Sequence, residues 1–274
     1  MLAALSLLAK AALYTGALSS AGLALHSIIL RKTYRICIVA FATILVFAVL
    51  VRLLLLNAEL SGGLSGLLDF SMFGWIWAPN QAQVLTYLLG SAFLMLGAAL
   101  NMRTSLIVGA ILVFAGAGLG GHTHGLDTPG ITPILVSVHV AIAAFWVTAP
   151  FVLWPRATNT DLELLNDTDR FSRVAVWCVP LLFLSGVWLA LRLSSSLENL
   201  LGETYGRLLL LKLFLAFCAL AIGAFNKFRV TQIMKSQAGQ ARVILKRALA
   251  LDYVLFAGIL LAVSAATTLT GPGA

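Results

Sequence analysis

Eight long apolar runs dominate the sequence and limit the solvent in which the chain can fold. The runs extend over Leu7–Leu30, Ile36–Leu56, Gln81–Leu100, Ser105–Leu119, Ile131–Trp154, Val174–Leu193, Tyr205–Phe225 and Ala248–Leu269. A helix that crosses the hydrocarbon core of a bilayer needs about 20 apolar residues. The runs are continuous rather than alternating, which excludes the strands of a membrane barrel. The sequence therefore predicts an all-α polytopic membrane helix bundle with about eight transmembrane helices, and residues 1–274 as a single integral membrane domain.

The composition excludes several classes of function. Hydrophobic residues make up 61% of the chain and charged residues only 10%, whereas soluble domains carry about 25% charged residues. A net charge of +8 would suggest nucleic acid in a soluble protein, but here it is explained by basic loops on one side of a membrane. We find no nucleotide fingerprint and no catalytic triad pattern. We therefore expect a protein that is not an enzyme and that binds the lipid bilayer, no nucleic acid and no nucleotide.

The charges of the loops predict the orientation. Basic residues follow the first, third, fifth and seventh runs: Arg31, Lys32, Arg35, Arg103, Arg156, Arg170, Arg173, Lys227, Arg229, Lys235, Arg242, Lys246 and Arg247. The other loops hold Glu59, Asp69, Asp127, Glu198 and Glu203. Since basic loops stay in the cytoplasm, both termini should face outward. The segment Asn57–Asn80 is then external, and an interfacial or re-entrant turn is expected there.

Three of the four histidines gather near the predicted outer face. His122 and His124 lie in a glycine-rich stretch after the fourth run, and His139 lies about two turns into the fifth. Imidazole suits copper, zinc and iron, so these three are candidate metal ligands. The alternative for His122 and His124 is that they are solvated loop residues. Trp146 is seven residues from His139 and therefore lies on the same helix face. It is a candidate pathway residue, and the alternative is that it is ordinary packing.

Other polar and sulfur-bearing residues could extend a metal site or a pathway. His26 lies near the inner end of the first run. It could be a ligand for an ion that leaves the bundle, or a helix-end histidine whose hydrogen bonds are satisfied within the protein. Met72, in the external segment, could offer a thioether to Cu(I). Arg207 could extend to the interface.

Two further charges within the spans should orient helices before they serve a pathway. Lys212 should find a partner, with Glu198 or Glu203 as candidates, and Asp252 could pair with the basic pair Lys246-Arg247.

Several of these residues lie in stretches that resemble the copper-resistance CopD family of inner-membrane proteins, most strongly over residues 119–272. The stretches are Gly121-His122, His139 to Trp146, Phe171-Ser172-Arg173, Leu184 to Trp188, Thr204 to Lys212, and Asn226-Lys227. Two departures stand out. The family commonly continues the His–apolar–Trp stretch as Trp-x-Gly-Gly, whereas here Pro150 follows and should kink the helix. Asp252 stands where a glutamate is usual, which keeps the carboxylate.

The resemblance implies copper ion transport, usually uptake, across the cytoplasmic (inner) membrane of a bacterium, with a role in copper homeostasis or resistance. The cargo would be a copper ion, Cu(I) or Cu(II), and a periplasmic copper-binding protein would be its possible partner. Two alternatives stay open. Histidines on facing helices could ligate haem in an electron-transfer protein, or the chain could be a subunit that hands copper to another membrane protein.

Overall fold

The computed structural model describes residues 1–120, 130–193 and 204–269, and all regular structure in these residues is helical. The elements are α1 (Leu2–Leu30), α2 (Arg35–Leu60), η1 (Leu64–Leu68), η2 (Phe70–Met72), α3 (Phe73–Leu100), α4 (Arg103–Gly118), α5 (Thr132–Val147), α6 (Ala149–Val152), α7 (Asp161–Leu193), α9 (Thr204–Phe225), the π-helix η4 (Asn226–Val230), α10 (Thr231–Ser236) and α11 (Ala238–Leu269). The predicted all-α class is confirmed.

Eight principal helices correspond to the eight apolar runs, and seven of them, counted over the described residues, are long and apolar enough to cross a membrane. The exception is α4, whose 16 residues extend over about 24 Å; α5 reaches the required length together with α6, over Thr132–Val152. The predicted number of helices is therefore confirmed, while seven rather than eight meet the length expected of a full span.

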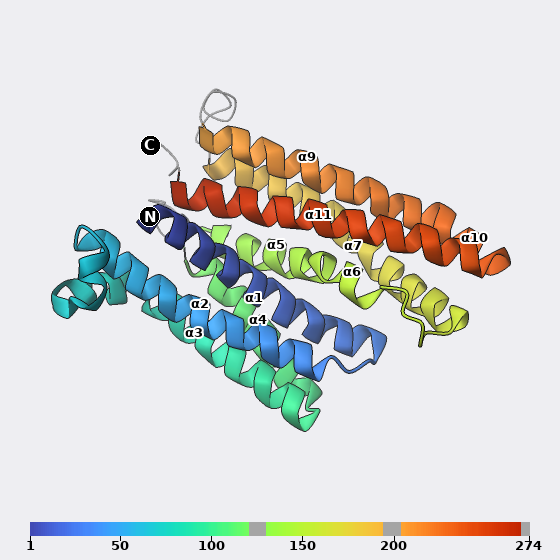
Figure 1. The fold of residues 1–274 in the computed structure, drawn as a ribbon, viewed down its shortest axis with the longest axis horizontal. Helices are drawn as coiled ribbons and strands as arrows, with labels where there is room; N and C mark the ends of the chain where they lie inside the picture. The colour runs from blue at the N-terminus through green and yellow to red at the C-terminus, as the bar shows by residue number, and fades with distance from the viewer. Residues whose placement is uncertain (121–129, 194–203, 270–274) are drawn as a thin grey trace.

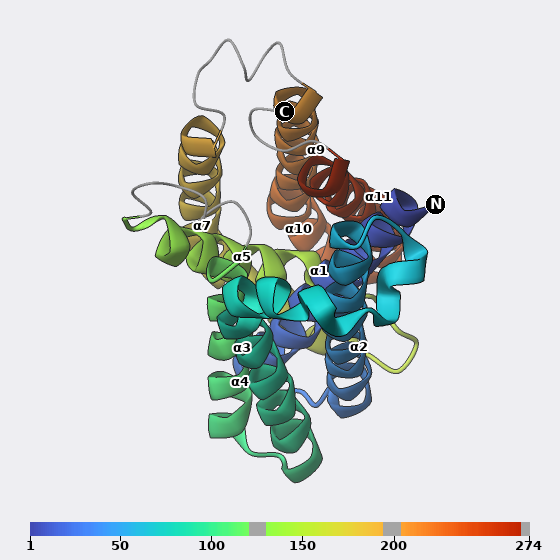
Figure 2. The ribbon, with the colours of Figure 1, turned by 90° about the vertical axis from the view of Figure 1, so that its left-hand side faces the viewer.

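The helices form two groups joined by α5 (Figures 1 and 2). The first group is α1–α4, and the second is α7, α9 and α11. Helix α5 packs against α1 and α4 on one side and α7 on the other, and α11 also packs against α1. Helix α1 begins and α11 ends at the same end of the bundle (Figure 1), where Lys10 Nζ donates to the Thr267 carbonyl at 2.5 Å.

Three helices begin at least two turns earlier than the apolar runs predict. Helix α3 starts at Phe73 rather than Gln81, α7 at Asp161 rather than Val174, and α11 at Ala238 rather than Ala248. In α7 the reason is a capping box. The Thr160 N–H donates to Glu163 Oε2 at 2.9 Å, and the Glu163 N–H donates to Thr160 Oγ1 at 3.2 Å. These bonds satisfy the first amides of a polar helical extension, which apolar length alone does not reveal.

The predicted break at Pro150 is confirmed. The expected run Ile131–Trp154 divides into α5, which ends at Val147, and α6, which begins at Ala149. Proline has no N–H to continue the helical ladder. Thr148 lies at the junction, and its hydroxyl donates back to the Ala144 carbonyl at 2.7 Å.

Glycines allow the closest helix contacts. A Cβ atom on Gly22 of α1 would lie 2.4 Å from the Ala144 carbonyl oxygen of α5. Gly90 of α3 and Gly109 of α4 face each other. A Cβ added to Gly90 would lie 3.1 Å from the Gly109 carbonyl oxygen, and one added to Gly109 would lie 2.9 Å from the Gly90 carbonyl oxygen. Small residues at such crossings let backbones approach, which is the main source of packing energy between helices in lipid.

Charged contacts gather at the end opposite the N-terminus. Lys32, after α1, forms an ion pair with Asp167 of α7, and Arg242 of α11 forms one with Asp161 at 2.5 Å. Burial raises the pKa of the neighbouring Tyr34 hydroxyl to about 12, with the negative charge of Asp167 adding to the effect. The basic loops therefore share one end of the bundle, as alternating topology requires. That this end is cytoplasmic, with both termini outward, remains a prediction.

The segment Asn57–Asn80 folds back on the end of α2. The Asn57 amide is buried and donates to the carbonyls of Gly66 and Asp69, both at 2.8 Å. The two short helices η1 and η2 follow, and a hydrogen bond from Ser71 lowers the pKa of Asp69. The segment therefore forms compact turns that lead directly into α3, while its predicted place at the outer interface stays a prediction.

Candidate metal centre

His139 lies on α5 and is held by α7. Its Nδ1 lies 2.9 Å from Ser185 Oγ, and Ser185 Oγ donates to the Leu182 carbonyl at 3.0 Å. The ring can approach α7 because the next residue is Gly186, where an added Cβ would lie 3.3 Å from His139 Cε1. An imidazole is therefore fixed within the bundle by a partner on another helix.

Sequence reasoning missed the role of Ser185. The residue belongs to the Leu184–Trp188 stretch, but its distance of 46 residues from His139 gave no sign of a contact. A serine next to glycine within an apolar run was the available signal, because a small polar residue in a span usually contacts another helix.

Lys212 of α9 is a cation that acts on this site. Its ammonium interacts electrostatically with the His139 ring. No ion pair of Lys212 is found among the residues the structure describes, and the proposed partners Glu198 and Glu203 lie outside them. A positive charge within the helices beside an imidazole would weaken cation binding at that ring unless an anion offsets it.

Trp146, seven residues after His139 on α5, packs against α7, α9 and α11. It is 7% exposed, its ring forms an edge contact with Phe171 at 6.3 Å, and an added Cβ on Gly223 of α9 would lie 3.0 Å from its Cζ2. Ala219 and Phe256 complete this cluster. The packing that was weighed for Trp146 is therefore present, and a pathway role stays a prediction.

His26 is fully buried where α1 meets α5 and α7. Its ring stacks on Phe145 at 4.7 Å and on Phe171 at 6.0 Å. Its Nε2 lies 2.9 Å from the Phe145 carbonyl oxygen, and since a carbonyl only accepts, Nε2 carries the proton. Nδ1 is buried and has no hydrogen-bond partner among the residues that the structure describes. The ring is thus partly satisfied, and whether it also binds an ion stays a prediction.

The structure describes the surroundings of none of the other predicted outer ligands. His122 and His124 lie outside the described residues, and for Met72 only the backbone, at the end of η2, is described. The described chain before the two histidines ends beside α5 and α3. An added Cβ on Gly118 would lie 2.3 Å from the Pro133 carbonyl oxygen, and Gly120 lies against Gln83. The glycine-rich stretch therefore begins close to the start of the helix that carries His139.

The pathway candidates in the C-terminal half differ in burial. Arg207 is exposed. Asn226 is 9% exposed and Asp252 4% exposed, and each has a buried Oδ1 without a hydrogen-bond partner in the described part of the chain. The proposed pairing of Asp252 with Lys246-Arg247 is not found, because Asp252 faces the interior whereas both basic residues are exposed. Lys246 instead lies over the Trp154 ring, 5.7 Å from its centroid.

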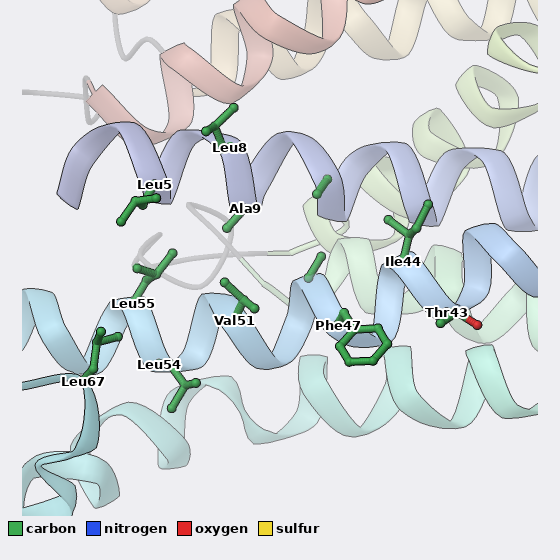
Figure 3. Close-up of a pocket in the computed structure, with 12 residues that line it drawn as sticks. Leu5, Leu8, Ala9, Thr43, Ile44, Phe47, Val51, Leu54, Leu55 and Leu67 are labelled. Atoms are coloured by element: carbon green, nitrogen blue, oxygen red, sulfur yellow. The ribbon is translucent and has the colours of Figure 1, made fainter. Parts of the chain in front are cut away.

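Within the described residues no group of three or more His, Cys, Asp and Glu side chains is placed to hold a metal ion. His139 contributes a single imidazole, so a complete ligand set would need residues outside the described ranges. A separate groove of about 570 Å³ between α1 and α2 offers no such set, since every lining side chain except Thr43 is apolar (Figure 3). It has the character of a lipid-facing surface.

Comparison with known proteins bears on the second group of helices. Residues 166–266 match the family model of copper resistance protein D (CopD). The resemblance to CopD is confirmed for this segment, which includes Ser185 and Lys212 and links the chain to copper resistance. His139 and Trp146 precede the matched segment, so the resemblance seen between residue 119 and residue 165 stays a prediction. Searches of curated proteins and of solved structures each found no match.

Proposed function

We propose that the protein transports copper ions across the cytoplasmic membrane of a bacterium, in the direction of uptake, and so contributes to copper homeostasis or resistance. One observation carries the proposal. The CopD-matched segment contacts an intramembrane imidazole directly, through the 2.9 Å bond between Ser185 and His139. Polar groups inside a span are costly and usually functional, and imidazole is a good copper ligand.

In this proposal His139 receives copper near the outer face, with His122 and His124 as the further ligands and Met72 as a thioether donor. Neutral imidazoles bind the ion without a buried anion. Deeper in the bundle, His26, Asn226 and Asp252 offer polar atoms that have no hydrogen-bond partner within residues 1–120, 130–193 and 204–269. A periplasmic copper-binding protein would deliver the ion. The chain acts as a carrier rather than an enzyme, and the haem and hand-over alternatives stay predictions.

The test is copper accumulation in bacterial cells that express the protein. His139→Ala should reduce the initial rate of copper uptake to that of cells without the protein. Val138→Ala is the matched control, because this neighbour on α5 is exposed and 43% accessible. Uptake by His139→Ala equal to that of Val138→Ala, at equal amounts of membrane protein, would count against the proposal. Copper flux into liposomes that contain only this chain then separates transport from hand-over.

A further inference from the structure

The hydrogen bonds around His139 favour one protonated ring nitrogen. Ser185 Oγ lies 2.9 Å from His139 Nδ1 and 3.0 Å from the Leu182 carbonyl oxygen, and a hydroxyl group has one proton to donate. Because a carbonyl only accepts, the two bonds form together when Ser185 donates to Leu182 and accepts from Nδ1–H.

In the neutral ring the other nitrogen, Nε2, is then left with its lone pair. Among the described residues Nε2 has no hydrogen-bond partner, and the His139 side chain is only partly buried. A nitrogen lone pair on a ring with a fixed orientation is what a metal ion requires.

We propose that Ser185 is a positioning residue that holds His139 as the Nδ1-protonated tautomer and thereby presents Nε2 to copper. The inference rests on the proposed function and assigns the ligand atom and its support. Metal-binding histidines commonly donate their second N–H to an oxygen acceptor, which fixes the ring and raises its basicity. Here the acceptor comes from α7 in the CopD-matched segment, and Gly186 leaves the space for the ring.

The first experiment reads the tautomer without copper. Nitrogen-15 NMR of histidine-labelled protein in lipid distinguishes a protonated ring nitrogen from one with a lone pair, and the His139→Ala spectrum identifies the signals of this ring. We expect protonated Nδ1 and lone-pair Nε2 in the wild type, and a mixture of tautomers in Ser185→Ala. A wild-type ring protonated at Nε2, or a Ser185→Ala spectrum identical to the wild type, would overturn the inference.

The second experiment measures Cu(I) affinity of the purified protein by competition with a coloured chelator. Loss of such a supporting partner weakens metal binding by about 10–100-fold, so Ser185→Ala should bind at least about tenfold more weakly. Ser185→Thr keeps the hydroxyl and should restore affinity. Ser264→Ala is the matched control, since this buried serine donates only to the carbonyl of Leu260 in its own helix.

The two measurements separate the inference from the proposed function. If the wild type and His139→Ala bind copper equally, the proposed function fails, whereas the NMR result still decides what Ser185 does to the ring. If His139→Ala loses copper binding but Ser185→Ala does not, the positioning role is refuted and the copper site stands.

Discussion

Substitution of His26 tests whether this buried histidine serves the fold or the passage of an ion. His26→Phe keeps a flat ring that can stack on Phe145 and Phe171, at the positions where centroids now lie 4.7 and 6.0 Å away. It removes the bond from Nε2 to the Phe145 carbonyl, but it also removes the buried, unpartnered Nδ1. The comparison variant is His26→Ala, which deletes the ring altogether.

The structure gives the expected magnitudes. The lost hydrogen bond is worth about 1 kcal/mol, and burial of an unsatisfied nitrogen costs about 1–3 kcal/mol, so the two changes in His26→Phe roughly cancel. The Phe145 carbonyl retains a weaker bond from Thr148 Oγ1 at 3.4 Å. His26→Ala loses the stacking and leaves a cavity, at a cost of about 2–4 kcal/mol. We therefore expect His26→Phe to lie within about 1 kcal/mol of the wild type.

The assay is reversible unfolding in mixed micelles, followed by near-ultraviolet circular dichroism. A His26→Phe variant as destabilised as His26→Ala would refute this reasoning, because the polar atoms rather than the ring would then support the fold. Copper uptake by the stable His26→Phe variant tests the second role. Uptake equal to the wild type would contradict the prediction that His26 is an exit ligand.

Three further predictions follow from single contacts. Gly22→Ala would place a Cβ 2.4 Å from a carbonyl oxygen of α5 and should destabilise the protein by about 1–3 kcal/mol, measured as a lower Tm. Gly74→Ala is the control and should leave the Tm unchanged, because its added Cβ has nothing within 4 Å. Equal Tm values for the two variants would contradict the close packing. Lys212→Gln should strengthen Cu(I) binding by about tenfold, because it removes on the order of 1.4 kcal/mol of repulsion between the lysine ammonium and a copper ion at His139. Weaker binding in the competition assay would instead indicate that the lysine supports the site. The pKa of Tyr34 is raised to about 12, above its ordinary value of about 10. The folded protein therefore retains a proton that the unfolded chain loses, and its stability should fall as the pH rises from 10 to 12. Tyr34→Phe should show a smaller fall in the same unfolding assay, and a pH profile identical to that of the wild type would refute the assignment.

Much of the architecture could be predicted before the tertiary structure was known. The apolar runs gave the number and order of the principal helices, and Pro150 gave the break between α5 and α6. Helix starts such as Asp161 were missed, because the capping box of α7 lies in polar sequence beyond the apolar run. The candidate site was predicted only as a set of residue types. His139 was named from its place within a span, while Ser185 was not.

The sequence by itself determined that the chain is a bundle of membrane helices with its basic loops at one end, because a bilayer leaves backbone groups no other partners and apolar length can be read directly. Only the tertiary structure decided which polar atoms meet. The bond between His139 and Ser185 joins residues 46 apart, and that between His26 and Phe145 joins residues 119 apart. Such contacts depend on where helices cross and how closely their glycines let them approach. That geometry arises from the packing of all the helices together, which no single segment encodes.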